Sequence, residues 1–231
     1  MTVPAIEIEG LRFAWGKHAP VLDIPSFHLA RGERLFLRGP SGSGKSTLLG
    51  IIAGVLGASA GSVRVLGEDM TALSGAARDR MRADHLGVIF QMFNLVPYLS
   101  VTGNVTLPLK FSAIRRRAVG SDPEAEAGRL LARLGLTDPA LLARRVSDLS
   151  VGQQQRVAAA RALIGAPEIV IADEPTSAVD ADARDRFIEL LSEETARTGA
   201  ALLFVSHDVS LARLFDRAVD LAEINRAGVS A

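Results

Sequence analysis

The most informative stretch of this chain is Gly39-Pro-Ser-Gly-Ser-Gly-Lys-Ser-Thr47. It satisfies the pattern G-x-x-x-x-G-K-S/T and lies between a short apolar run at residues 35–37 and a helix-like run at residues 45–53. Glycines let backbone N–H groups turn inward around phosphate oxygens, and the start of a helix adds a partial positive charge. A flexible Gly/Ser turn would explain the glycines but not a lysine and two hydroxyls at this spacing. The stretch therefore predicts a phosphate-binding loop between a strand and a helix.

This loop predicts ATP as the ligand, with Lys45 placing its charge beside the β and γ oxygens and Ser46 ligating Mg²⁺. The residues expected to contact the nucleotide here are Gly39, Pro40, Ser41, Gly42, Ser43, Gly44, Lys45, Ser46 and Thr47.

Two carboxylates, Asp173 and Glu174, follow the apolar run at residues 169–172. The carboxyl end of a buried strand lies beside the phosphate loop in such folds, so we expect both side chains near it. Asp173 is expected to hold Mg²⁺ through water. Glu174 is expected to point to the other side of the strand and to polarise a water for attack on the γ-phosphate. Alone, the pair could be a strand end that meets solvent; together with the loop it predicts ATP hydrolysis.

The pattern of apolar residues predicts an α/β fold. Short alternating segments fill the first 67 residues, and the runs at 86–90, 169–172 and 201–205 lack polar alternation, which is typical of parallel strands covered on both faces. The stretch 92–166 is predicted to be mainly helical. Within it, the charge run Arg115–Arg117 is interpreted as a solvated loop.

The composition excludes several classes of protein. A length of 231 residues with 48% apolar side chains suits one sizeable core. The 26 basic and 26 acidic side chains cancel, which argues against nucleic acid as a partner. The chain has no cysteine for disulfides or thiolate metal sites, no apolar run long enough to cross a bilayer, and no signal peptide at residues 1–10. We therefore expect a cytoplasmic protein.

A second motif, Leu149-Ser-Val-Gly-Gln-Gln-Gln-Arg156, precedes a predicted helix that runs to about residue 164. It resembles the L-S-G-G-Q signature of ABC ATPases; the alternative is an ordinary helix cap. The resemblance implies a head-to-tail dimer, in which the signature residues of one copy cover the γ-phosphate bound by the other. Val151 stands where the family most often has glycine, and its branched side chain restricts close approach. The signature residues expected to contact nucleotide are Ser150, Val151, Gly152 and Gln153.

Four further positions follow in family order. The resemblance implies that Gln91 contacts Mg²⁺ and the attacking water, that His207 contacts the γ-phosphate, and that Trp15 stacks on adenine. It also identifies Ser177-Ala-Val-Asp180 as a loop that crosses to the second copy, with Asp180 near the nucleotide. Taken singly, these residues could be a strand-end amide, a structural histidine, a packed indole and a helix cap.

The resemblance covers residues 5 to about 225 and implies a P-loop NTPase fold. This comprises a RecA-like core with an N-terminal antiparallel β subdomain at about 1–91 and 167–231, and an α-helical subdomain at about 92–166.

Residues 90–109 further resemble the single-domain ATPases of the lipoprotein-release, macrolide-efflux and cell-division groups. This implies permease subunits as partners, contacting the region Phe93–Leu99, and a peripheral location on the inner face of the cell membrane. A set of exposed residues is expected to form a socket for the permease. The alternative is that these residues pack the helical insert against the sheet. The members of this set are Phe93, Leu95, Pro97, Tyr98 and Leu99.

Two functions stay open at this point. The first is an ATPase that drives export or extraction of a hydrophobic or lipoprotein-like substrate. The second is an ATPase that regulates an envelope enzyme mechanically through a membrane partner and moves no solute. DNA-repair ATPases with related sites would need a long insert between Gln91 and Ser150, and translation factors would need two copies of these motifs.

Overall fold

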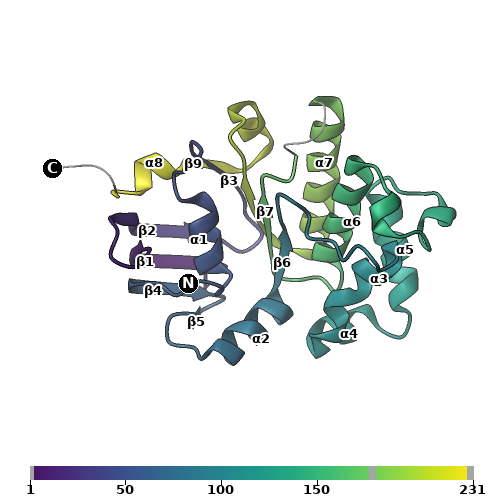
Figure 1. Cartoon of the computed structure of the whole chain (residues 1–231), viewed down its shortest axis with the longest axis horizontal. Helices are drawn as coiled ribbons and strands as arrows, with labels where there is room; N and C mark the ends of the chain where they lie inside the picture. The colour runs from purple at the N-terminus through teal and green to yellow at the C-terminus, as the bar shows by residue number, and fades with distance from the viewer. Residues whose placement is uncertain (1–2, 177–180, 228–231) are drawn as a thin grey trace.

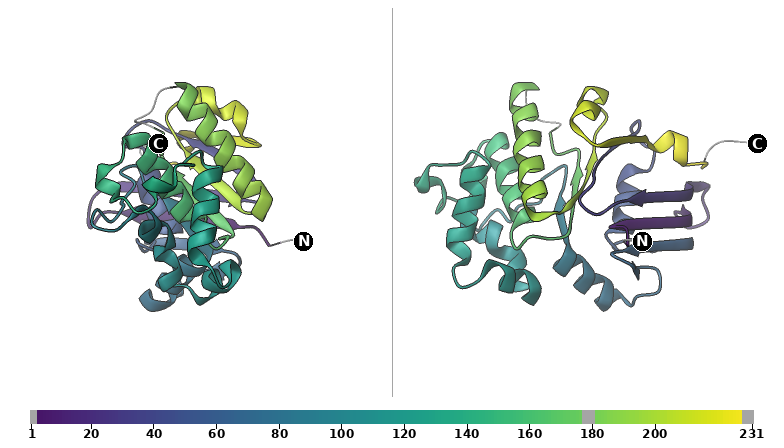
Figure 2. Two further views of the ribbon diagram at one scale, coloured as in Figure 1. Left: turned by 90° about the vertical axis from the view of Figure 1, so that its right-hand side faces the viewer. Right: turned by 180° about the vertical axis from the view of Figure 1, so that it is seen from behind.

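The structure, a computed structural model, describes residues 3–176 and 181–227. An antiparallel sheet lies at one end of the molecule, a parallel sheet crosses the middle, and a layer of helices covers the far side (Figure 1). Seen from behind, the purple antiparallel strands and the teal and green helices again lie at opposite ends (Figure 2). The strands are β1 (Ile6–Ala14), β2 (Pro20–Leu29), β3 (Arg34–Arg38), β4 (Ala60–Val65), β5 (Glu68–Asp69), β6 (Leu86–Ile89), β7 (Ile169–Asp173), β8 (Ala201–Val205) and β9 (Arg217–Asp220).

Helices follow most of these strands. The α-helices are α1 (Lys45–Ile52), α2 (Gly75–His85), α3 (Val101–Thr106), α4 (Ala113–Val119), α5 (Pro123–Arg133), α6 (Val151–Leu163), α7 (Ala181–Thr198) and α8 (Leu221–Ile224). The 3-10 helices are η1 (Leu107–Lys110), η2 (Pro139–Leu141), η3 (Val146–Asp148) and η4 (Val209–Leu214).

The central sheet has the strand order β6-β7-β8-β3-β9, and all its pairs are parallel. Strands β7 and β8 are buried along almost their whole length, and β3 and β6 over most of theirs, which confirms the interpretation of the unalternating apolar runs. In β8, Leu202 and Phe204 face the helical layer, while Leu203 and Val205 face the side of α1 and the antiparallel sheet. The central sheet therefore separates two hydrophobic cores, one on each face. The ends of its strands lie between these cores.

The antiparallel sheet has the order β2-β1-β4-β5 and confirms the predicted N-terminal β part. Helix α1 packs over it through Leu48 and Ile52, which are fully buried. Helices α3, α5 and α6 pack on the other side of the central sheet. Helix α6 comes so close to β6 that a Cβ added at Gly87 would lie 2.2 Å from the carbonyl oxygen of Ala162. The helix that carries the second motif is therefore fixed directly to the sheet.

One sequence-based expectation is wrong here, and one helix was missed. The charge run forms part of α4 rather than a solvated loop, and Arg115 is only 3% exposed. Its guanidinium donates to the carbonyl oxygens of Ala162 (2.7 Å), Ile164 (2.8 Å) and Leu86 (3.3 Å), and these hydrogen bonds offset the cost of burying a charged group. Helix α2 was not predicted, because none of its residues is buried and it carries no apolar stripe.

Candidate nucleotide-binding site

The phosphate loop joins β3 to α1, in the predicted order. Gly42 and Gly44 have φ values of +79° and +97°, a region that glycine adopts without strain. Lys45 is 7% exposed, and its Nζ donates to the carbonyl oxygens of Gly39 (2.7 Å) and Pro40 (3.0 Å). The loop therefore curls around its own lysine ammonium, at the position where α1 begins.

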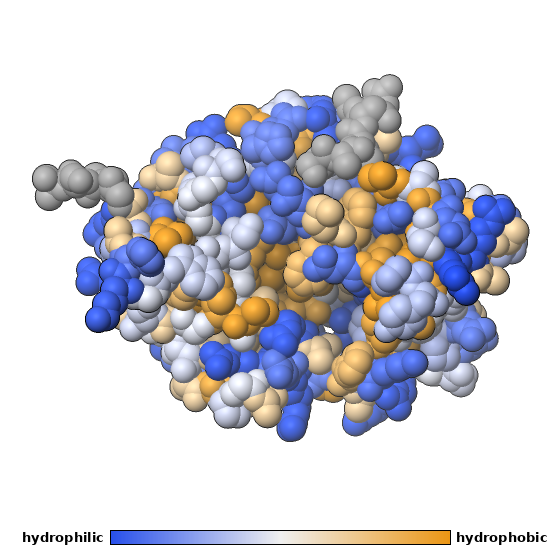
Figure 3. Space-filling model, viewed as in Figure 1, coloured by the Kyte–Doolittle hydropathy of each residue, from blue (hydrophilic) through white to orange (hydrophobic). Residues whose placement is uncertain are grey.

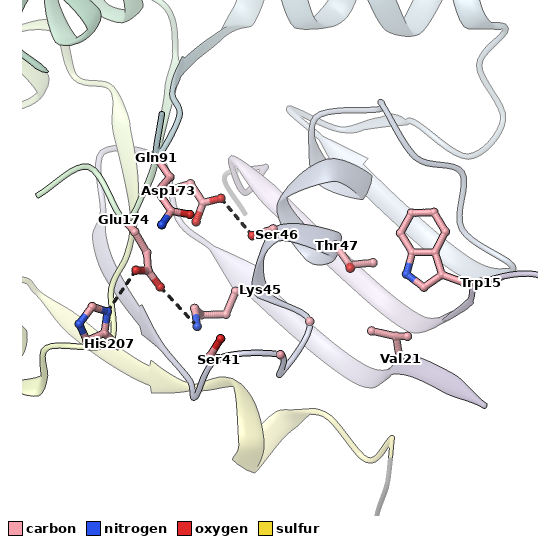
Figure 4. Close-up of a pocket in the computed structure, with 12 residues that line it drawn as sticks. Trp15, Val21, Ser41, Lys45, Ser46, Thr47, Gln91, Asp173, Glu174 and His207 are labelled. Atoms are coloured by element: carbon pink, nitrogen blue, oxygen red, sulfur yellow. Dashed lines mark hydrogen bonds and ion pairs between the residues drawn. The ribbon is translucent and has the colours of Figure 1, made fainter. Parts of the chain in front are cut away.

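The two carboxylates lie against this loop, as Figure 4 shows. The hydroxyl of Ser46 donates to Oδ2 of Asp173 at 3.2 Å, and Oε1 of Glu174 lies 3.6 Å from Nζ of Lys45. The expectation that Glu174 points to the other side of the strand is wrong, because β7 ends at Asp173 and Glu174 has a φ of +44°. This left-handed backbone brings both carboxylates into one cavity, at a conformational cost of about 1–2 kcal/mol.

His207 completes the cluster from the end of β8. Its Nδ1 lies 3.1 Å from Oε2 of Glu174, so the carboxylate lies between an imidazole and an ammonium (Figure 4). Burial raises the pKa of Asp173 above its usual value, the hydrogen bond from Ser46 opposes this shift, and the charge of Glu174 adds to it. A cation bound beside Asp173 would favour its ionised form.

These groups line one cavity with a volume of about 770 Å³. It unites predicted residues from five separate parts of the chain, and Val21, which belongs to none of the motifs, forms part of its wall. The predicted residues that line it are Trp15, Ser41, Gly42, Gly44, Lys45, Ser46, Thr47, Gln91, Asp173, Glu174 and His207. Gly39 and Pro40 line a smaller hollow that also includes His207.

The oxygen donors at the cavity suit Mg²⁺. The hydroxyl of Ser46 and the carboxylate of Asp173 are within 3.2 Å of each other, and the amide of Gln91 lines the same cavity. Within residues 3–176 and 181–227, no group of three or more His, Cys, Asp or Glu side chains could hold a metal ion. Mg²⁺ in nucleotide sites takes one or two protein oxygens, and water and phosphate oxygens complete its shell, so the donors here fit it.

The second motif does not reach this cavity. Ser150 caps α6 through a capping box: its Oγ accepts from the N–H of Gln153 at 3.3 Å, and Oε1 of Gln153 accepts from the N–H of Ser150 at 2.9 Å. Val151 is 48% exposed, and a Cβ added at Gly152 would meet nothing within 4 Å. Among the residues that the structure describes, nothing covers this side of the motif. Asp180 and its loop lie outside the described residues.

Comparison with known proteins agrees with this geometry. The family model described as ABC transporter matches residues 22–177. The chain belongs to the ABC transporter family. It is 42% identical over 227 residues to the lipoprotein-releasing system ATP-binding protein LolD of Anaeromyxobacter dehalogenans (strain 2CP-C), covering 96% of this chain and 92% of that protein. Membership confirms the predicted family and, with it, an ATPase that drives transport rather than one of DNA repair or translation.

Two further relatives extend the comparison. The macrolide export ATP-binding/permease protein MacB of Rhodopseudomonas palustris (strain HaA2) is 38% identical over 96% of this chain, which covers 34% of that longer protein. The dimeric structure of the ATP-binding cassette MJ0796, in a post-hydrolysis state bound to ADP and Pi, has a TM-score of 0.83 at 31% identity and covers 93% of both chains. The P-loop NTPase fold class is thereby confirmed.

In this ABC family member, the segment after Gln91 is only partly the exposed socket that the sequence predicted. Phe93 is 8% exposed and packs in the core, so its expected exposure is wrong, whereas Pro97 and Tyr98 are exposed. Beside the segment lies an apolar groove of about 350 Å³, which we call the Phe90–Phe111 groove. It is lined by Arg82, Ala83, Leu86, Gly87, Val88, Phe90, Asn94, Leu107, Pro108, Phe111, Arg115, Arg161 and Ala162.

Trp15 is positioned as a stacking platform. It follows β1 directly, its side chain is 50% exposed, and its ring meets that of Phe13 edge-on, with centroids 4.9 Å apart. Replacing Trp15 by alanine should weaken ATP binding about tenfold, because base stacking on an aromatic ring contributes about 1–3 kcal/mol. Trp15→Phe should retain most of the affinity. Calorimetric titration would measure both variants, and an alanine variant that binds ATP as the wild type does would refute the stacking role.

Proposed function

We propose that this chain is the ATP-hydrolysing subunit of a complex that exports or extracts a hydrophobic or lipoprotein-like substrate through a separate permease. The observation that carries the proposal is the single cavity in which the loop lysine, two carboxylates and His207 converge. The relatives named for lipoprotein release and macrolide export favour this substrate class over regulation of an envelope enzyme without transport. On this proposal the protein works in the cytoplasm, peripheral to the inner face of the membrane.

The roles of the side chains follow from their contacts. Lys45 neutralises the charge of the β and γ phosphates, and the backbone N–H groups of its loop bind their oxygens. Glu174 is the general base that accepts a proton from the attacking water, with Lys45 and His207 fixing its carboxylate on the phosphate side. Ser46, Gln91 and Asp173 would hold Mg²⁺, which supplies positive charge against the phosphates.

The open second motif supports a dimer as the working form. Ser150 and Gly152 lie at the positive N-terminal end of α6, Ser150 is exposed, and a Cβ added at Gly152 would meet nothing within 4 Å. We propose that they cover the nucleotide held by a second copy, so that each site is shared. ATP then binds the closed dimer more tightly than the open dimer. This difference in affinity is what drives closure and can move a partner.

The Phe90–Phe111 groove is the proposed docking surface for the permease. The side chain of Phe111 is 69% exposed, that of Phe90 is 43% exposed, and that of the neighbouring Met92 is 81% exposed. Exposed apolar side chains that gather in this way are typical of a surface that binds another protein. On the face seen in Figure 3, hydrophobic residues gather near the middle and on the helical side of the molecule. Within the described residues, none of the helices has the length and apolarity needed to cross a membrane. A relative that carries its permease in the same polypeptide supports such a partner.

A charge placed in the groove tests this function. Phe111→Asp, co-expressed with its permease partner, should lose membrane association and permease-stimulated ATPase activity, because a carboxylate would be buried at the interface. Basal ATPase activity of the purified protein should be retained. Val55→Asp, at an apolar residue that is 66% exposed and outside the groove, is the matched control. Unchanged membrane association of Phe111→Asp would argue against docking here.

A further inference from the structure

The C-terminal segment of the described chain connects the edges of the two sheets. It leaves β9, the edge strand of the parallel sheet, and passes through α8 to β2, the edge strand of the antiparallel sheet (Figure 1). There the N–H of Arg226 donates to the carbonyl oxygen of Asp23 at 2.8 Å. The segment thus satisfies backbone groups on the free edge of β2, which would otherwise be unpaired.

The side chain of Asn225, in this segment, makes four hydrogen bonds. Its Oδ1 accepts from the N–H of Asp23 at 2.8 Å and from the N–H of Ala227 at 3.1 Å. Its Nδ2 donates to the carbonyl oxygens of Val21 at 3.0 Å and of Ser43 at 3.5 Å. These contacts fix the orientation of the amide. If it were flipped, its NH₂ group would face two N–H groups and its oxygen would face two carbonyl oxygens.

Both partners of the Nδ2 group belong to the nucleotide site. Val21 lines the cavity at the same end as Trp15, away from Glu174 and His207 (Figure 4), and Ser43 lies in the phosphate loop. The loop abuts β2 so closely that a Cβ added at Gly44 would lie 3.3 Å from Cγ1 of Val21. Asn225 therefore bonds to both sides of the junction between the loop and the wall near Trp15.

We infer that Asn225 is a positioning residue for nucleotide binding, which fixes the Val21 wall against the phosphate loop and so sets the affinity of this chain for ATP and ADP. The inference rests on the proposed function of the cavity. A wall held in place before binding costs less to order when the nucleotide enters, so its loss lowers affinity. The hydrogen bonds of Asn225 go to backbone atoms, not to Glu174 or His207, so the hydrolysis step should be unaffected.

Two variants and one control test this role. Asn225→Asp keeps the shape and the acceptor but turns an oxygen towards the carbonyl oxygens of Val21 and Ser43. Asn225→Ala removes all four bonds and serves if the aspartate variant fails to fold. Arg226→Gln is the control, because it changes the net charge in the same direction and leaves the backbone bond to Asp23 intact. Trp15 is the only tryptophan, so its fluorescence reports ADP binding directly.

We expect both Asn225 variants to bind ADP with Mg²⁺ about tenfold more weakly than the wild type, as the loss of net hydrogen-bond energy predicts. Their kcat at saturating ATP should stay within about twofold, and Arg226→Gln should bind normally. Equal affinities in the Asn225 variants and the wild type would overturn the inference, as would a fall in kcat alone or an equal loss in Arg226→Gln. A wild-type protein that fails to bind ADP would instead refute the proposed function.

Discussion

Lys45→Ala is expected to abolish nucleotide binding and, with it, ATP hydrolysis. The ammonium is buried within the loop, where Gly39 and Pro40 direct carbonyl oxygens at it, and water cannot replace its charge beside the phosphates. Charge-assisted hydrogen bonds contribute about 1.5–3 kcal/mol each, so ATP affinity should fall about 10²-fold or more. Calorimetric titration with ATP and Mg²⁺ measures the loss. Lys110→Ala, at an exposed lysine, is the control; unchanged affinity in Lys45→Ala would remove Lys45 from the site.

Mixing subunits extends this prediction to the dimer. Ser150→Ala removes the capping hydroxyl from the open motif and should impair the site of the other copy. A dimer that pairs one Lys45→Ala subunit with one Ser150→Ala subunit has one composite site in which both residues are intact. Some ATPase activity should therefore return on mixing the two inactive proteins. No recovery at any mixing ratio would argue against a shared site.

The parts that sequence predicted best are those in which chemistry and local order coincide. The phosphate loop needs its glycines, lysine and hydroxyls in nine consecutive residues, so the pattern itself indicates the geometry. Asp173 and Glu174 were predicted as site residues because they end a buried strand. The direction of Glu174 was not, since a positive φ at a glutamate has no sequence signal.

The parts that sequence missed depend on tertiary contacts. Val21 is an ordinary strand residue and Asn225 an ordinary polar residue, and only the fold brings Val21 into the wall of the cavity and Asn225 against Val21. Arg115 was misassigned because an arginine run usually faces solvent, whereas here three backbone carbonyl groups receive the guanidinium. Phe93 was assigned to the surface for its place in a motif, although it fills the core beneath the helical layer.

Glu174→Gln is expected to bind ATP and hydrolyse it about 10²-fold or more slowly, by the usual contribution of a positioned general base. Glutamine preserves the shape of the side chain but cannot take the proton of the attacking water. The substitution also removes the ion pair between Glu174 and Lys45. Because the negative charge of Glu174 opposes binding of the phosphates, its loss should not lower the affinity for ATP. A phosphate-release assay and an ATP titration separate the two effects. Glu68→Gln, at an exposed glutamate far along the chain, is the control.

Slow hydrolysis should also make the closed dimer accumulate. We expect the mass of Glu174→Gln, measured by light scattering after size exclusion, to shift from monomer to dimer when ATP and Mg²⁺ are added. Such a shift would show that the branched side chain of Val151, exposed at the first turn of α6, is tolerated at the interface. A persistent monomer that still binds ATP would mean that closure needs the membrane partner or that Val151 weakens it. Normal turnover by Glu174→Gln would refute the general-base role, because no other carboxylate on the described chain contacts both Lys45 and His207.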